Sequence, residues 1–162
     1  MKKLFLFFTF TLYLFSLQAQ WQKVYNSENN YEISFPGIAE KSYNPNSGDV
    51  IYYFKGLNYF FMASVSEYKG NLQKKYSIED IKESAFEGFS KSFNATRIID
   101  SKIYYKNFEG WEFLFSVSNM VPFQNGMIRV ILAERRMVSL IYIYTVYDNE
   151  LINKFFNSLV IK

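Results

Sequence analysis

The sequence predicts an α+β domain in which a mainly antiparallel β-sheet lies between helices, an α/β/α arrangement. Two observations carry this prediction. In residues 109–147, apolar and polar residues alternate in three consecutive runs that are rich in β-branched and aromatic residues, which is typical of strands. The last run, residues 137–146, is apolar on both faces, as expected of a central strand with a layer over each face of its sheet.

The first 19 residues have the pattern of a secretory signal peptide. Two lysines precede an apolar core at residues 4–17, and cleavage is predicted between Ala19 and Gln20. The apolar run is shorter than the roughly twenty residues that a membrane-spanning helix needs. We therefore expect residues 20–162 to form a single secreted or periplasmic domain with no stable membrane span after signal removal. An uncleaved N-terminal anchor is the alternative.

The mature chain is close to neutral. The sequence has 18 Lys and Arg against 15 Asp and Glu, and two lysines but no acids lie in the predicted signal, which leaves 16 against 15, a net charge of +1. Nucleic-acid-binding domains carry a marked basic excess, so this class is excluded. The chain has no cysteine, and it is therefore predicted to lack both disulfides and the acylated thiol of a lipoprotein.

Four strands are predicted before the first helix of the domain. Residues 21–25 are expected to form a short edge strand, and the alternation of residues 31–35 predicts a half-buried strand that ends at Pro36. Residues 38–49 have the composition of a loop. Residues 50–55 and 59–68 are predicted to form a hairpin around a turn that contains glycine and asparagine.

An amphipathic helix over residues 77–93 is the next element. Ser77 is a favourable N-cap, with Asp80 in the capping-box position, and Asn94 ends the helix. Apolar residues at helical spacing predict the face that packs on the sheet: Ile78, Ile81, Ala85, Phe86, Phe89 and Phe93.

The C-terminal half is predicted to contain the long strands. Residues 96–105 form a strand that leads into the three runs described above, and Asn125-Gly126 has the sequence of a type I′ hairpin turn. A second turn is expected at residues 134–136. Asp148 then caps a short helix whose apolar side faces inward, and residues 158–161 form a last strand.

This order of elements resembles the PsbP-like α/β/α sandwich family, which includes small secreted bacterial proteins of unknown role. The matching pieces span nearly all of the mature chain: Ile33-Ser34-Phe35-Pro36, Gly110-Trp111-Glu112, Leu140-Ile141-Tyr142 and Phe155-Phe156-Asn157-Ser158-Leu159. The family's usual Leu-Tyr at the start of the late strand is Met137-Val138 here. The resemblance implies a binding or accessory role without a shared catalytic site, so it assigns no functional residues.

Several catalytic chemistries are excluded by composition. Without histidine, the chain cannot form a Ser-His-Asp triad or a histidine-ligated metal site, and without cysteine it has no thiol nucleophile. The seven glycines are scattered, so no phosphate-binding loop is present. No cofactor is predicted, and no motif identifies a ligand or an oligomeric state.

Two alternatives involve carbohydrate. Glu109 and Glu112 flank Trp111, which resembles the acid pair of a glycosidase, although residues three apart on a strand point to opposite faces. An enzyme acting on envelope glycan is therefore the first alternative. The second is a carbohydrate-binding domain that uses exposed tyrosines between Tyr43 and Tyr53.

The last candidate site is the charged turn at Glu134, Arg135 and Arg136. Arginine donates planar, paired hydrogen bonds, so Arg135 and Arg136 are candidate contacts for a partner protein of the envelope. A solubilising turn is the alternative interpretation. The leading hypothesis is a secreted or periplasmic, non-enzymatic binding or accessory module of the bacterial envelope.

Overall fold

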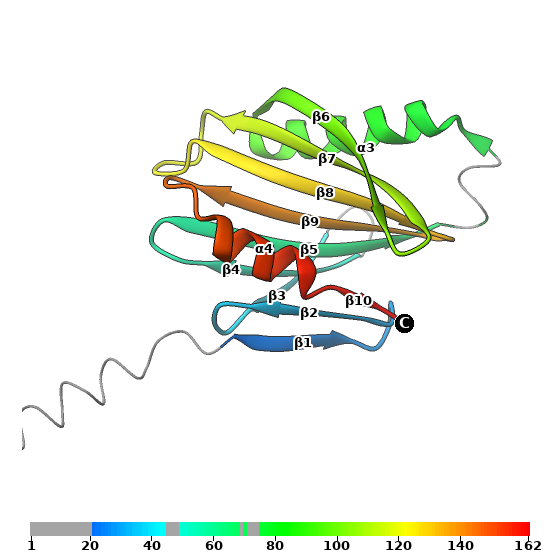
Figure 1. Cartoon of the computed structure of the whole chain (residues 1–162), viewed down its shortest axis with the longest axis horizontal. Helices are drawn as coiled ribbons and strands as arrows, with labels where there is room; N and C mark the ends of the chain where they lie inside the picture. Colours follow the sequence, from blue (N-terminus) through cyan, green and yellow to red (C-terminus); the bar gives the residue numbers. More distant parts are fainter. Residues whose placement is uncertain (1–20, 45–48, 69, 71–74) are drawn as a thin grey trace, which may run out of the picture.

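The structure, a computed structural model, describes residues 21–44, 49–68, 70 and 75–162. Within these residues it contains a seven-stranded sheet, a three-stranded sheet and two helices, with all strand pairs antiparallel (Figure 1). The predicted signal peptide and its cleavage position between Ala19 and Gln20 lie outside the described residues. No helix among the described residues is long and apolar enough to cross a membrane.

The large sheet confirms the predicted central strand, because β9 is the fourth of its seven strands. β9 lies between β5 and β8 and pairs with both along its whole length. The strands, in spatial order, are β3 (Glu40–Tyr43), β4 (Val50–Lys55), β5 (Tyr59–Glu67), β9 (Arg136–Tyr144), β8 (Asn125–Ala133), β7 (Phe108–Val117) and β6 (Ala95–Tyr105).

A small sheet lies below the large one in Figure 1 and joins the two ends of the domain. Its order is β1 (Gln22–Asn26), β2 (Tyr31–Phe35) and β10 (Val160–Ile161). Each strand is predicted by the sequence, but their separation into a second sheet is not. The side chains of β2 alternate between buried and half-buried, as its period of two predicts.

The two helices lie on opposite faces of the large sheet (Figure 1). In α3 (Ile78–Phe93), the Ser77 side chain accepts a hydrogen bond from the Asp80 backbone N–H, and Asn94 ends the helix in a left-handed conformation with φ of 48°. In α4 (Asn149–Asn157), the Asp148 side chain accepts from the Leu151 backbone N–H. Both predicted caps are confirmed, and each satisfies a backbone donor that has no partner within its helix.

Each face of the large sheet has its own core. On one face, Phe89 of α3 packs edge-on against Phe115 of β7, with ring centroids 4.5 Å apart. On the other, Phe155 of α4 contacts Phe61 of β5 at 4.7 Å and Phe35 of β2 at 5.5 Å. Phe155 therefore connects the small sheet to the large one. The α+β fold with a mainly antiparallel sheet between helices is confirmed.

The loop predicted over residues 38–49 is wrong in part, because it contains β3. The four residues Glu40–Tyr43 pair with β4, and all four side chains are exposed. An edge strand with no buried face has no apolar alternation, so the sequence pattern gives no signal for it. Residues 45–48 of the predicted loop lie outside the described residues.

The hairpin turn predicted at Asn125-Gly126 is also wrong, because both residues belong to β8. Residues 118–124 make the connection from β7 instead. Gly126 lies opposite Phe115, and a Cβ at this position would overlap the Phe115 ring and lie 2.8 Å from the Tyr142 carbonyl oxygen. The glycine therefore serves close packing within the sheet and not a turn.

Candidate functional site

Helix α3 does not cover the whole face of the large sheet, and a groove runs along its side. The phenylalanines of α3 pack on β7, while two adjoining cavities of about 320 and 370 Å³ lie between the helix and strands β4, β5 and β9. Both cavities are lined by Ser84 and Ala85 of α3 and by Met137 of β9, so they form one continuous depression, which we name the α3 groove.

Small side chains on three elements create the α3 groove. Gly88 and Ser84 face it from the helix, and a Cβ built on Gly88 would meet no atom within 4 Å. Ser64 of β5 lies directly opposite Ser139 of β9 in the strand register. Apolar side chains on the same face of the sheet, Ile51, Met62, Ile128 and Ile141, form the floor. The groove therefore combines an apolar floor with short hydroxyl side chains.

Three serine hydroxyls in the α3 groove are available to a ligand. The Ser66 hydroxyl donates to Asp49 at 2.6 Å. In contrast, the hydroxyls of Ser64, Ser84 and Ser139 have no hydrogen-bond partner in the described part of the chain. Each can donate one hydrogen bond and accept others.

The two ends of the α3 groove are aromatic. At the N-terminal end of α3 lie Tyr68 and Tyr76, and burial raises the pKa of the Tyr68 hydroxyl above its ordinary value. At the other end lies Phe93, whose ring contacts Phe60 at 6.3 Å; Phe60 in turn stacks on Tyr53 at 6.1 Å. No lysine or arginine lines the groove within the described residues.

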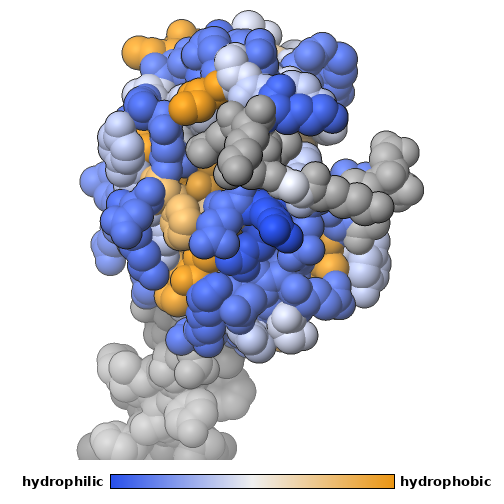
Figure 2. Space-filling view, turned by 90° about the vertical axis from the view of Figure 1, so that its right-hand side faces the viewer, coloured by the Kyte–Doolittle hydropathy of each residue, from blue (hydrophilic) through white to orange (hydrophobic). Residues whose placement is uncertain are grey.

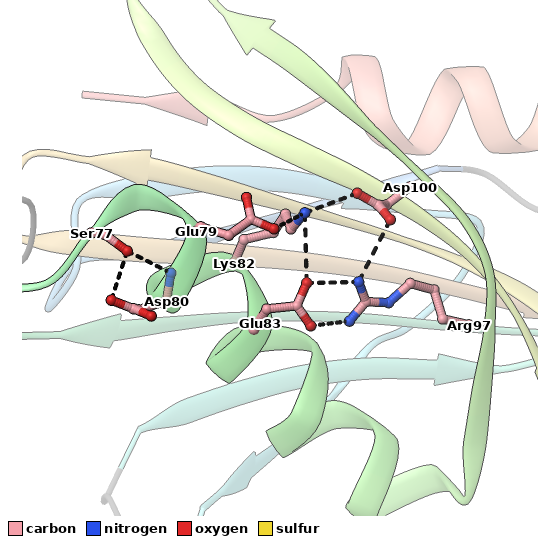
Figure 3. Close-up of polar contacts among 7 residues, drawn as sticks. All are labelled: Ser77, Glu79, Asp80, Lys82, Glu83, Arg97 and Asp100. Atoms are coloured by element: carbon pink, nitrogen blue, oxygen red, sulfur yellow. Dashed lines mark hydrogen bonds and ion pairs between the residues drawn. The ribbon is translucent and has the colours of Figure 1, made fainter.

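An ion-pair network between α3 and β6 fixes the helix beside the groove (Figure 3). Lys82 contacts Glu79 at 2.5 Å and Asp100 of β6 at 3.2 Å. Arg97 of β6 donates to both carboxylate oxygens of Glu83, at 2.8 and 2.5 Å. The Arg97 guanidinium holds the pKa of the Glu83 carboxyl down to about 2. The spacing of the α3 charges is visible in the sequence, but their partners on β6 are not.

The two glutamates of the glycosidase alternative do not converge. Both lie on β7, three residues apart, so their side chains point to opposite faces of the sheet. Glu109 forms an ion pair with Lys102 of β6, and Glu112 accepts from the Arg129 Nε of β8 at 2.6 Å. This arrangement does not supply the facing carboxyl pair that glycoside hydrolysis uses.

The tyrosines between Tyr43 and Tyr53 are divided between the two faces of the sheet. Tyr53 is paired with Glu40 and lies on one face, whereas Tyr52 is paired with Lys41 and shares the other face with Tyr43. The Tyr53 hydroxyl donates to Glu40 at 2.5 Å. Among the described residues, no ring contact joins Tyr43, Tyr52 and Tyr53 to one another.

The two arginines of the charged turn have different surroundings. Arg136 opens β9, and its guanidinium donates to the Asn29 carbonyl at 2.5 Å and to the Lys162 carbonyl at 3.4 Å, which ties the turn to the small sheet. The Arg135 side chain is exposed. The turn between β8 and β9 lies at the right-hand end of the sheet in Figure 1, the end that faces the viewer in Figure 2, where hydrophilic residues dominate. Arg135 thus remains the better placed of the two for a partner.

Metal binding has little support from the acidic residues. Among residues 21–44, 49–68, 70 and 75–162, no three acidic side chains are close enough together to hold a metal ion. Three of the acids near α3, Glu79, Glu83 and Asp100, instead form ion pairs with Lys82 and Arg97, as Figure 3 shows.

Comparisons with known proteins identify the fold alone. No protein-family model matches the chain, and no curated protein is similar to it in sequence. Among solved structures, cyanobacterial PsbP (CyanoP) from Synechocystis sp. PCC 6803 superimposes with a TM-score of 0.62, covering 89% of this chain and 94% of CyanoP at 13% sequence identity. The chain therefore has the PsbP-like fold that its sequence predicts.

Proposed function

We propose that the protein is a secreted or periplasmic binding or accessory module of the bacterial envelope, without catalytic activity, and that the α3 groove is its binding site. The observation that carries this proposal is the set of three unpartnered hydroxyls, on Ser64, Ser84 and Ser139, above an apolar floor. Ligand sites commonly combine apolar walls with a few polar groups that fix orientation.

A binding role is favoured over catalysis by the residues available. The chain has neither histidine nor cysteine, and its candidate acids, Glu109 and Glu112, are held apart in separate ion pairs. The described lining of the groove has no histidine, lysine or arginine, and its two carboxylates, Asp49 and Asp80, accept hydrogen bonds from Ser66 and Ser77 and not from the three unpartnered serines.

The lining of the α3 groove favours an uncharged amphipathic ligand. Its two cavities fall at the small end of the roughly 300–1,000 Å³ that ligand pockets occupy. An anion would find no lysine or arginine in the described lining, whereas an apolar chain with hydroxyl or amide groups would match the serines and the floor.

The substitution Gly88→Leu tests the groove with little risk to the fold. A side chain at Gly88 enters open space, and replacing a helical glycine favours the helix by about 0.5–1 kcal/mol. The neutral dye N-phenylnaphthylamine should fluoresce with the wild type and lose its binding in Gly88→Leu. Glu87→Leu, on an exposed part of the same helix, is the matched control and should retain dye binding.

Equal dye binding by the wild type and Gly88→Leu would contradict the proposal that the α3 groove is the binding site. The envelope role has its own test, which is recovery of the native protein from envelope fractions together with a bound component, and mass determination of an N-terminus at Gln20. A clean monomer without any companion at every salt concentration would count against an accessory role.

A further inference from the structure

Three loops meet at one end of the large sheet. The register places Tyr144, the last residue of β9, between Tyr59 at the start of β5 and Asn125 at the start of β8. The connections that flank these residues therefore lie side by side, at the left in Figure 1. We name them together the apolar loop end, which comprises residues 56–58, 118–124 and 145–147.

Each of these loops exposes a large apolar side chain. Leu57 is 84% exposed, Val121 is 90% exposed and Val146 is 67% exposed, and Tyr147 beside them is 53% exposed. Single exposed apolar residues are ordinary on protein surfaces. Four of them gathered on three adjoining loops instead indicate a surface that meets an apolar partner.

Hydrogen bonds hold the three loops together. The Thr145 backbone N–H donates to the Asn58 carbonyl at 3.0 Å, and the Thr145 hydroxyl donates to the Pro122 carbonyl at 3.1 Å. The Gln124 backbone N–H donates to the Tyr144 carbonyl at 3.2 Å. The apolar tips are thus presented as one surface, with little further ordering needed on binding.

We propose that the apolar loop end docks on a lipid bilayer and places Leu57, Val121 and Val146 among the acyl chains just below the headgroups. These highly exposed side chains lie on three separate loops, so they suit a fluid apolar phase better than a complementary protein surface. Tyr144 and Tyr147, whose rings meet at 5.5 Å, flank Val146 in the chain, and aromatic residues with a polar hydroxyl favour the membrane interface.

The start of the described chain lies at the same end. Trp21 contacts Phe61 at 6.4 Å and lies beside Asp148 and Leu151, which follow the Val146 loop directly. In the sequence, Trp21 comes four residues after the apolar run of residues 4–17. The chain thus enters the domain from the side that is proposed to face the bilayer. The opposite end of the molecule is mostly hydrophilic (Figure 2).

Charge around the apolar loop end is balanced. Lys55 ends β4 directly before the loop of residues 56–58, and Lys154 lines one hollow with Asp148 and Glu150 next to the Val146 loop. A patch without net charge gains little from anionic lipids, so docking on neutral phospholipid should be insensitive to salt.

Site-specific labelling tests the proposal, because the chain has no cysteine of its own. Leu57→Cys, Val121→Cys and Val146→Cys each take an environment-sensitive dye, and phosphatidylcholine vesicles are added to the full protein. The dye at all three positions should move to an apolar environment. Tyr104→Cys, at a residue that is 69% exposed near the β6–β7 turn and so at the opposite end of β7, should show no change. No shift at the tips, or an equal shift at Tyr104, would overturn the proposal.

A second variant measures the contribution of the tips. The triple substitution Leu57→Ser, Val121→Ser and Val146→Ser should lower vesicle partitioning by about tenfold for each side chain. Tyr104→Ser should leave it unchanged, and circular dichroism should show that both variants are folded. Unchanged partitioning of the triple variant, or a dye response to lipid-free envelope protein in place of vesicles, would refute docking on lipid.

Discussion

Arg97 and Glu83 join the edge strand β6 to helix α3 through two hydrogen bonds between guanidinium and carboxylate (Figure 3). The same guanidinium lies 4.5 Å from the centre of the Phe86 ring, so it covers the core of this face as well. The position of α3 sets the width of the α3 groove. This pair therefore connects the stability of the helix to the proposed binding site.

The first prediction concerns the pH dependence of this pair. The pKa of Glu83 is lowered from 4.5 to about 2 in the folded protein, so its stabilising effect is fully present above pH 4.5 and is lost as the pH falls through 2. The urea midpoint of Glu83→Gln should lie below that of the wild type at pH 7, and the difference should shrink by pH 3. Because Glu83 is half exposed, the effect is screened by solvent and modest.

Arg97→Met supplies the control for this measurement, since it retains apolar cover for Phe86 and removes the charge. In the Arg97→Met background, Glu83→Gln should have a smaller effect, because only the contact of Glu83 with Lys82 at 3.5 Å remains. An undiminished pH dependence without Arg97 would show that Arg97 is not the main cause of the low pKa of Glu83.

The second prediction tests the packing of α3 on the sheet. Phe89 is 7% exposed and its ring lies between Phe115 and Phe93, at 4.5 and 4.8 Å. Phe89→Ala should lower the free energy of unfolding by about 3–5 kcal/mol, seen as a lower denaturant midpoint with little change in slope. Glu87→Ala, at an exposed position, should change it by less than about 0.5 kcal/mol. Equal effects would mean that α3 packs through another face.

The sequence predicts those elements whose own residues carry the apolar pattern or the cap that defines them. The two apolar faces of residues 137–146 are sufficient to place β9 at the centre of the sheet, and Ser77 with its apolar stripe is sufficient for α3. β3 has four exposed side chains and therefore no period to detect. The sequence wrongly predicts a turn at Gly126, because the glycine is required there by the Phe115 ring on the neighbouring strand, and this contact cannot be read from the local sequence.

The candidate site is harder to predict than the fold, because it depends on register between distant segments. The α3 groove exists because Ser64, Ser139 and Gly88 face one another from three elements, and nothing in the local sequence marks them as neighbours. The apolar loop end likewise joins Leu57, Val121 and Val146, which are separated by more than twenty residues each in the chain. Both features follow from strand pairing and not from composition.

The third prediction contrasts two glycines. Gly126→Ala places a Cβ against the Phe115 ring and near the Tyr142 carbonyl, and this overpacking should lower the free energy of unfolding by about 1–3 kcal/mol. Gly88→Ala meets only open space and should raise it by about 0.5–1 kcal/mol. Thermal or urea unfolding of the two variants decides the matter; a loss of stability in Gly88→Ala would contradict the open geometry of the groove.

The fourth prediction separates the two arginines that the sequence offers as partner contacts. Arg136 donates to the carbonyl groups of Asn29 and Lys162, so Arg136→Ala leaves both acceptors without this partner and should cost about 1 kcal/mol in unfolding free energy. Arg135→Ala removes an exposed side chain and should cost less than about 0.5 kcal/mol.

Arg136→Ala is expected to lose more stability than Arg135→Ala. In a binding assay with a partner protein, Arg135→Ala should instead show the larger loss. If Arg135 meets an envelope partner, Arg135→Ala should weaken co-purification from envelope fractions while its urea midpoint stays at the wild-type value. Arg136→Lys keeps the charge but loses the paired donors, and it should behave like Arg136→Ala in unfolding. A stability loss in Arg135→Ala equal to that of Arg136→Ala would show that the turn is held by contacts other than those of Arg136.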